Sequence, residues 1–130
     1  MSKLKLTITH FKLLDTIKWL NDQGYYASNQ GVYKITHGVY DKDTINFTGC
    51  PTFSTLVSYG SKKISRLLLP LCRYGYVSKV NYEPTNTLYL RITPKGREVL
   101  EQYHKKHLNE YKKKFKKEIP QIVKIEKSTF

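Results

Sequence analysis

The sequence predicts an α+β fold, and three observations lead to it. Apolar residues recur every three or four positions near the N-terminus, in residues 61–74 and in the final third, as on one side of a helix. Between Tyr76 and Thr93 the period changes to two, as in a pair of strands. The chain has 130 residues, of which 39% are hydrophobic, enough for one modest core. We therefore expect one domain over residues 1–118, followed by a flexible tail over residues 119–130.

The first helix is expected over Thr9–Gln23. Thr9 is a residue type that favours the N-cap, and Gly24 is a type that follows helix C-termini. The apolar stripe of this helix consists of Leu13, Ile17 and Leu20. This stripe predicts that one side of the helix faces the core.

Residues 25–50 are an unusual insert that is rich in tyrosine. Val32–Ile35 and Val39–Tyr40 are short segments with strand-favouring residues on either side of a glycine, which predicts a hairpin. Ile45 and Phe47 indicate a further short strand. We thus expect strands within the insert and helices on both sides of it.

A second helix is expected from Pro51 or Thr52 to Tyr59. Proline suits the first helical position, and Gly60 favours an end. The expected inner face of this helix consists of Phe53, Leu56 and Val57.

A third helix is expected to begin with Ser61 as its N-cap and to close at Gly75. Its apolar stripe consists of Ile64, Leu67, Leu68 and Leu71. Pro70 lies inside this pattern. Because a proline in mid-helix lacks the N–H group that the helix needs, we expect a bend or an early end there.

The chain then changes to a β-hairpin and a long helix. Tyr76–Tyr82 and Leu88–Thr93 alternate in polarity about a turn at Glu83–Asn86, where proline stands at a favoured position. The last helix is expected to begin at Pro94, capped by the threonine before it, and to continue to Glu118.

Charge is the strongest global signal. The formal net charge of +13 indicates a polyanionic partner, either nucleic acid or an anionic membrane surface. Residues 60–82 carry 5 basic and no acidic side chains, whereas residues 1–59 carry 6 basic and 4 acidic ones. The sequence has no apolar run of about 18 residues and no signal-peptide pattern. We therefore expect a cytoplasmic protein that does not span a membrane.

Two stretches resemble a known superfamily. Residues 61–79, SKKISRLLLPLCRYGYVSK, resemble the recognition helix of winged helix-turn-helix proteins and the wing strand that follows it. Residues 88–103, LYLRITPKGREVLEQY, are similar to the second wing strand and next helix of the MarR and PadR groups, including their T-x-x-G turn. The resemblance covers residues 52 to about 103, and the insert at 25–50 departs from it. It implies a three-helix core, a β-hairpin wing and a long C-terminal helix.

The resemblance also implies that the acid-free face of the third helix enters the major groove of DNA. Arg66 is then the best candidate for a bidentate guanine contact, whereas Lys62 and Lys63 meet phosphates. Residues of the wing would add contacts to phosphates or to the minor groove. The expected DNA-binding residues are Ser61, Lys62, Lys63, Ser65, Arg66, Arg73, Lys79, Asn86 and Arg91. The plainer interpretation is that they are solvated charges on an amphipathic helix.

The sequence indicates no catalytic chemistry. Its acidic residues are few and scattered, and no nucleophile–base pair or glycine-rich phosphate loop stands out, so we expect no enzyme activity and no cofactor. His104 and His107 have the spacing of metal ligands, but the lysines between them would repel a cation, so we expect no metal site. Cys50 and Cys72 are expected to be free thiols.

Three functions are open at this point. The first is a transcriptional regulator that binds double-stranded DNA and forms a homodimer through its last helix. The second is an accessory protein of replication or of a mobile element that binds single-stranded DNA and assists a larger polymerase or helicase. Insert tyrosines such as Tyr33 and Tyr40 would stack on unpaired bases, unless they simply cover the core. The third is a protein–protein adaptor, and because winged helices serve all three, the fold alone does not choose.

Overall fold

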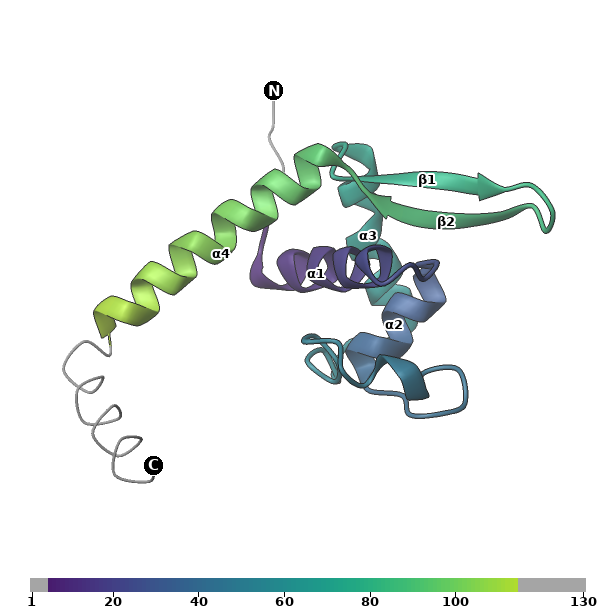
Figure 1. Ribbon diagram of the computed structural model, residues 1–130, viewed down its shortest axis with the longest axis horizontal. Coiled ribbons are helices and arrows are strands. Elements are labelled where there is room, and N and C mark those ends of the chain that lie inside the picture. The colour runs from purple at the N-terminus through teal and green to yellow at the C-terminus, as the bar shows by residue number, and fades with distance from the viewer. Residues whose placement is uncertain (1–4, 115–130) are drawn as a thin grey trace. The chain divides into compact units, whose positions relative to one another are not determined.

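The computed structural model describes residues 5–114, with side chains up to Leu108, and the chain divides after Leu100 into two compact units. In the described residues the arrangement is α+β, as predicted, with four α-helices and one two-stranded antiparallel sheet (Figure 1). The predicted continuation to Glu118 and the predicted tail lie outside the described residues. In chain order the elements are α1 (Ile8–Asp22), α2 (Asn29–His37), the 3-10 turn η1 (Ile45–Phe47), α3 (Ser61–Arg73), β1 (Val77–Tyr82), β2 (Thr87–Ile92) and α4 (Pro94–Lys114).

The cap of α1 is Thr7 and not Thr9, so the helix begins earlier than predicted. Thr7 Oγ1 accepts a hydrogen bond from the backbone N–H of His10 (3.5 Å), and His10 Nδ1 accepts one from the backbone N–H of Thr7 (3.0 Å). This reciprocal pair satisfies two N–H groups that a helix start leaves without partners. At the other end Gly24 has a φ of +82°, which confirms the predicted glycine stop. The predicted stripe is buried: Leu13, Ile17 and Leu20.

The predicted hairpin in the insert is wrong, because residues 29–37 form α2. Ser28 caps the start of this helix by accepting the N–H of Gly31 (2.9 Å), and Gly38 ends it in the left-handed region, with a φ of +87°. Gly38 is also required by space, since a Cβ atom there would collide with the side chain of Ser54. The buried residues of α2, at helical spacing, are Val32, Ile35 and Thr36.

The predicted helix at 52–59 is also wrong, because two of its backbone N–H groups bond to carbonyls of α2. Ser54 donates to the carbonyl of Ile35 (2.9 Å), and Leu56 donates to that of Thr36 (2.8 Å), near the C-terminus of α2. Ser54 has a φ of +63°, outside the right-handed helical region. The segment is therefore a series of turns that satisfies the last carbonyls of α2.

Residues 38–60, all within the described part of the chain, connect α2 to α3 and contain no strand. The predicted strand at Ile45 and Phe47 is the 3-10 turn η1. Leu56 is buried as predicted, whereas Val57 is 55% exposed, because the turns do not keep helical spacing.

The N-cap of α3 is Gly60, one residue before the predicted Ser61. The helix does not end early at Pro70 but continues to Arg73. Gly75, with a φ of +83°, closes the element as predicted. Three of the four residues of the predicted stripe are buried: Ile64, Leu68 and Leu71.

The predicted hairpin after α3 is confirmed. β1 and β2 are antiparallel around a turn at residues 83–86, with Tyr82 opposite Thr87. Ala27, in the segment between α1 and α2, extends the sheet by one bridge, because the N–H of Leu90 donates to its carbonyl (2.6 Å). The outer edge of β2 is therefore covered at this point.

The start of α4 is fixed against the base of the hairpin. Thr93 Oγ1 accepts the N–H of Gly96 (3.1 Å), as predicted for a cap, and donates to the carbonyl of Gly75 (2.6 Å). A Cβ atom at Gly96 would collide with the carbonyl of Tyr76. The T-x-x-G turn thus has a physical reason, because the threonine ties the helix to the hairpin and the glycine permits their close approach.

The core of the first unit lies between α1, α2, α3 and one face of the hairpin (Figure 1). Asn21, near the end of α1, joins this helix to β2. Its Oδ1 accepts the N–H of Ile92 (2.9 Å), and its Nδ2 donates to the carbonyl of Leu90 (3.4 Å). These bonds and the Ala27 bridge hold the hairpin beside α1.

Candidate nucleic-acid interface

The first half of α3 presents its polar side chains to solvent. Ile64, Leu68 and Leu71 hold the helix to the core, so its opposite side is open. All nine residues predicted to bind DNA are exposed, five of them in this half of the helix: Ser61, Lys62, Lys63, Ser65 and Arg66. The others are Arg73, Lys79, Asn86 and Arg91. Exposure is required for contact with DNA, but many solvated charges share it.

The cations of α3 lack the carboxylate partners that several other cations have in the described residues. Lys18, Lys34 and Arg97 each have a nitrogen 2.8–3.4 Å from an aspartate oxygen. Within the described part of the chain, no ion pair involves the four cations of α3, which are Lys62, Lys63, Arg66 and Arg73. An unpaired surface cation leaves its field open to an external anion.

The N-terminus of α3 also has no side-chain cap. Its N-cap is Gly60, and its first turn contains no acidic residue. The first backbone N–H groups therefore have no side-chain acceptor, and the positive end of the helix dipole adds to the charges of Lys62 and Lys63. Lys63 Nζ lies 5.0 Å from the centre of the Tyr59 ring, a cation–π distance. Phosphate oxygens are suitable acceptors at such a helix start.

The hairpin divides the predicted wing residues between its two faces. Lys79 pairs with the buried Leu90, and Arg91 pairs with Ser78 one position along. Because side chains alternate along a strand, Lys79 and Arg91 project to opposite faces. Lys79 shares its face of the hairpin with the buried Val77 and Leu90, so it lies on the side that faces the core and α3. Arg91 belongs to a different surface.

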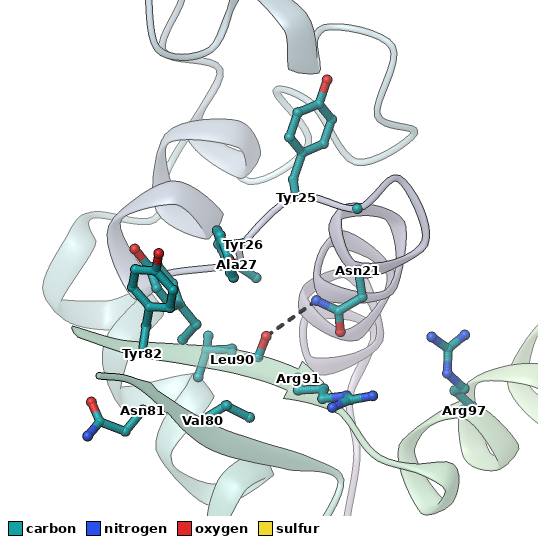
Figure 2. A pocket seen from close by; sticks show the side chains of 12 residues that line it. Asn21, Tyr25, Tyr26, Ala27, Val80, Asn81, Tyr82, Leu90, Arg91 and Arg97 are labelled. Carbon is teal, nitrogen blue, oxygen red and sulfur yellow. Dashed lines mark hydrogen bonds between the residues drawn. The ribbon is translucent and has the colours of Figure 1, made fainter. Parts of the chain in front are cut away.

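That other surface holds a pocket of about 520 Å³. The pocket lies between the end of α1, the segment that leads to α2, and the outer face of the hairpin (Figure 2). Figure 2 shows Tyr26 and Tyr82 toward one end of the pocket and Arg91 and Arg97 toward the other. The sequence had predicted Arg91 for a DNA contact but gave no indication of a pocket beside it.

Three tyrosines, which we call the tyrosine cluster, meet at this pocket: Tyr26, Tyr82 and Tyr89. Tyr26 stacks on Tyr89 with ring centres 4.6 Å apart, and its ring lies 5.5 Å from that of Tyr82. Tyr26 remains 66% exposed and Tyr82 39% exposed. Sequence reasoning missed this cluster. Strand alternation places Tyr82 and Tyr89 on one face, but Tyr26 joins them only through the Ala27–Leu90 bridge.

Of the insert tyrosines, Tyr26 belongs to the tyrosine cluster, whereas Tyr33 and Tyr40 lie outside it. Tyr33 is half-buried against the core, and its ring centre lies 5.1 Å from that of His37. Tyr40 is 67% exposed, but it contacts no other aromatic ring among the described residues. The covering role fits Tyr33, and Tyr40 is a lone exposed ring.

Comparison with protein-family models, curated proteins and solved structures found no match to this chain. In the described residues, no group of three or more His, Cys, Asp or Glu side chains is placed to hold a metal ion. Cys50 and Cys72 are free thiols, as predicted. No helix in residues 5–114 combines the length and the apolar character that crossing a membrane requires. A functional assignment therefore rests on the residues of this chain alone.

Proposed function

We propose that this chain is a winged-helix protein that binds double-stranded DNA through α3 and acts as a small transcriptional regulator. The observation that carries the proposal is the exposed side of α3, whose cations have no carboxylate partner in the described residues. The net charge of +13 supports a polyanionic partner.

The order of elements supports the winged-helix part of the proposal. Three helices precede a two-stranded hairpin and a further helix, and the Ala27 bridge stands between the first two helices, where winged helices hold a short strand. One feature differs from simple helix-turn-helix proteins, in which a turn of about 3–4 residues joins the two helices. Here residues 38–60 connect them, and this segment packs back onto the end of α2.

In the proposed complex the N-terminal half of α3 enters the major groove. Arg66 donates to the O6 and N7 atoms of guanine, because its planar guanidinium matches their geometry. Lys62, Lys63 and the uncapped helix start contact phosphates, which position the protein without reading sequence. Lys79 and Asn86 contact the backbone from the α3 side and the tip of the hairpin. Arg91, on the opposite face, is left out of this interface.

The test is fluorescence anisotropy of a labelled duplex with charge-reversal variants. Lys62→Glu with Arg66→Glu is expected to abolish measurable binding, because it places two anions where phosphates must approach. The matched control is Lys18→Glu with Lys105→Glu, which changes the net charge equally at two cations that are already paired. The control is expected to bind with an affinity close to that of the wild type.

Salt dependence gives a second readout of the same complex. If about six phosphates are neutralised, the logarithm of the affinity falls with the logarithm of salt at a slope of about −5. Equal losses in both double variants would show that bulk charge and not α3 is responsible. A flat salt dependence would exclude the nucleic-acid proposal and leave a protein partner as the main alternative.

A further inference from the structure

The tyrosine cluster is assembled from two parts of the chain that are distant in sequence. Tyr26 precedes α2, whereas Tyr82 and Tyr89 lie on the two strands of the hairpin. The Ala27–Leu90 bridge fixes this assembly, because it aligns residues 26–27 with the edge of β2. Ala27 is fully buried, so its neighbour Tyr26 points to the opposite, solvent side of the sheet.

Large aromatic side chains are usually buried when their only role is packing. Tyr26 contacts both other rings of the cluster and is still 66% exposed, so much of its surface is open to a ligand. The sheet around it adds the half-exposed Val80, on the same face as Tyr82 and Tyr89. An exposed aromatic surface on a sheet is the type of platform on which unpaired bases stack.

The pocket beside the cluster is basic. Its lining includes Arg91 and Arg97 but no carboxylate. The nearby Asp22 is already bound by Arg97 (2.8 Å) and Lys18 (3.0 Å), and these hydrogen bonds lower its pKa, so it stays ionised and paired. Arg91 has no ion-pair partner in the described residues and points along the pocket (Figure 2). An anionic group that enters the pocket therefore meets an available guanidinium.

We propose that this pocket binds an unpaired nucleotide of DNA, with its base stacked on the tyrosine cluster and its phosphate beside Arg91. The proposal rests on the proposed function, because it places a single strand next to the duplex held by α3. The pocket and Lys79 lie on opposite faces of the hairpin, so the strand has to pass around the hairpin. Because every base has an aromatic face, this contact is expected to tolerate any sequence.

The experiment compares two labelled probes, a blunt duplex and the same duplex with an oligo-dT overhang of about 10 nucleotides, a length within known single-strand sites. Wild-type protein is expected to bind the overhang probe about fivefold or more tightly than the blunt duplex, since stacking contributes at least this much per base. Tyr26→Ala is expected to remove that gain and to leave the blunt-duplex affinity unchanged. Tyr26→Phe, which keeps the ring, is expected to retain the gain.

The matched control is Tyr40→Ala, because Tyr40 is 67% exposed, nearly the same as Tyr26, but lies outside the cluster. It is expected to behave as the wild type on both probes. Arg91→Gln tests the other end of the pocket. It is expected to reduce the gain in affinity for the overhang probe, but by less than Tyr26→Ala does. Circular dichroism of each variant checks that its fold is intact.

The outcomes separate this proposal from the duplex proposal. If Tyr26→Ala keeps the overhang gain, or Tyr40→Ala loses it equally, the pocket does not bind a base, whatever the duplex result. If sedimentation shows that Tyr26→Ala disrupts a dimer, the cluster is an interface between two copies and the proposal is overturned. If the blunt duplex does not bind but the strand binds in a Tyr26-dependent manner, the duplex proposal fails and the pocket proposal stands. If neither probe binds, both fail.

Discussion

Residues 29–60, which comprise α2 and the connection after it, pair one of their two lysines with aspartates, whereas α3 pairs none of its four cations with a carboxylate in the described residues. In the first region Lys34 pairs with Asp41 (3.4 Å) and Asp43 (3.3 Å), and backbone N–H groups of the connection bond to the end of α2. In α3 no cation has a carboxylate partner among the described residues, and its first turn has no side-chain cap.

This difference separates charges that support the fold from charges that are available to a partner. Burying or pairing a charge inside the protein reduces its attraction for external ions. Residues 29–60 carry two basic and two acidic side chains, whereas α3 carries four basic and no acidic ones, so composition already indicates the difference. The contacts show which cations are paired, and the following variants test the distinction from the largest expected effect to the smallest.

The largest difference in duplex affinity is expected between variants that neutralise the unpaired cations of α3 and variants that neutralise paired cations elsewhere. Lys62→Gln with Arg66→Gln is expected to weaken duplex binding by about 10- to 100-fold and to reduce the salt slope by about 1, because the proposed complex then loses one phosphate contact and one guanine contact. Lys18→Gln with Lys34→Gln removes the same net charge and is expected to change the affinity less than about threefold. Anisotropy titrations at several salt concentrations measure both quantities. Similar losses of duplex affinity in the two double variants would show that paired and unpaired cations contribute equally to binding.

Gly38→Ala is expected to destabilise the fold without changing the proposed DNA interface. Alanine at this position has to adopt the left-handed φ of +87°, and its Cβ atom collides with the side chain of Ser54. We therefore expect the free energy of unfolding to fall by about 2 kcal/mol or more. Gly49→Ala is the control, since a Cβ there meets no atom within 4 Å. Urea denaturation measures both. Duplex affinity well below the melting temperature is expected to be unchanged, and a large loss of affinity would show that the connection takes part in binding.

In α1 a titratable side chain also has a partner within the fold, because His10 accepts the backbone N–H of Thr7 in the capping box. Burial lowers the pKa of His10, so the unfolded chain binds a proton more readily than the native one. Stability is therefore expected to be complete above about pH 6.5 and to fall as the pH decreases from there toward the lower folded pKa. His10→Gln keeps an acceptor at the third helical position and is expected to reduce this fall. Melting temperatures at pH 7.5 and pH 5.5 test it, with His104→Gln, at an exposed position, as the control.

Asp43→Asn is expected to have the smallest effect. Lys34 keeps its second partner, Asp41, and exposed ion pairs contribute little. Neither the melting temperature nor the duplex affinity is expected to change measurably. A marked gain in affinity would indicate that Lys34 is held back from DNA by Asp43, which would move residues 29–60 into the interface.

The insert at 25–50 and the segment of α3 and the hairpin differ in how well the sequence predicts them. In α3 and the hairpin, the apolar stripe, Gly75 and the change of period agree with the structure, because local propensity and burial point in one direction. In the insert, Ser28 and Gly38 are suitable caps for a helix, but β-branched residues between them favour a strand. The burial of three side chains at helical spacing overrides that preference. This burial depends on tertiary packing, which cannot be predicted from the local sequence.

The candidate site was predictable in part. The exposed side of α3 follows from the position of its stripe, so its five polar residues could be named from the pattern. The division of Lys79 and Arg91 between two faces requires the strand register, which depends on the turn and its neighbours. The tyrosine cluster was not predictable, because Tyr26 reaches it through a single bridge to Leu90, and no local pattern specifies that bridge.

The bond between Asn21 and Ile92 sets an order of events during synthesis. Its two residues are separated by 71 positions. At a translation rate of about 5–20 residues per second, β2 is made about 4–14 s after the end of α1. Until then the side-chain amide at the end of α1 has water as its partner, and Ala27 has no strand to pair with. In the nascent chain α1 thus lacks its contact with the hairpin, and the first unit packs fully only after β2 has been made.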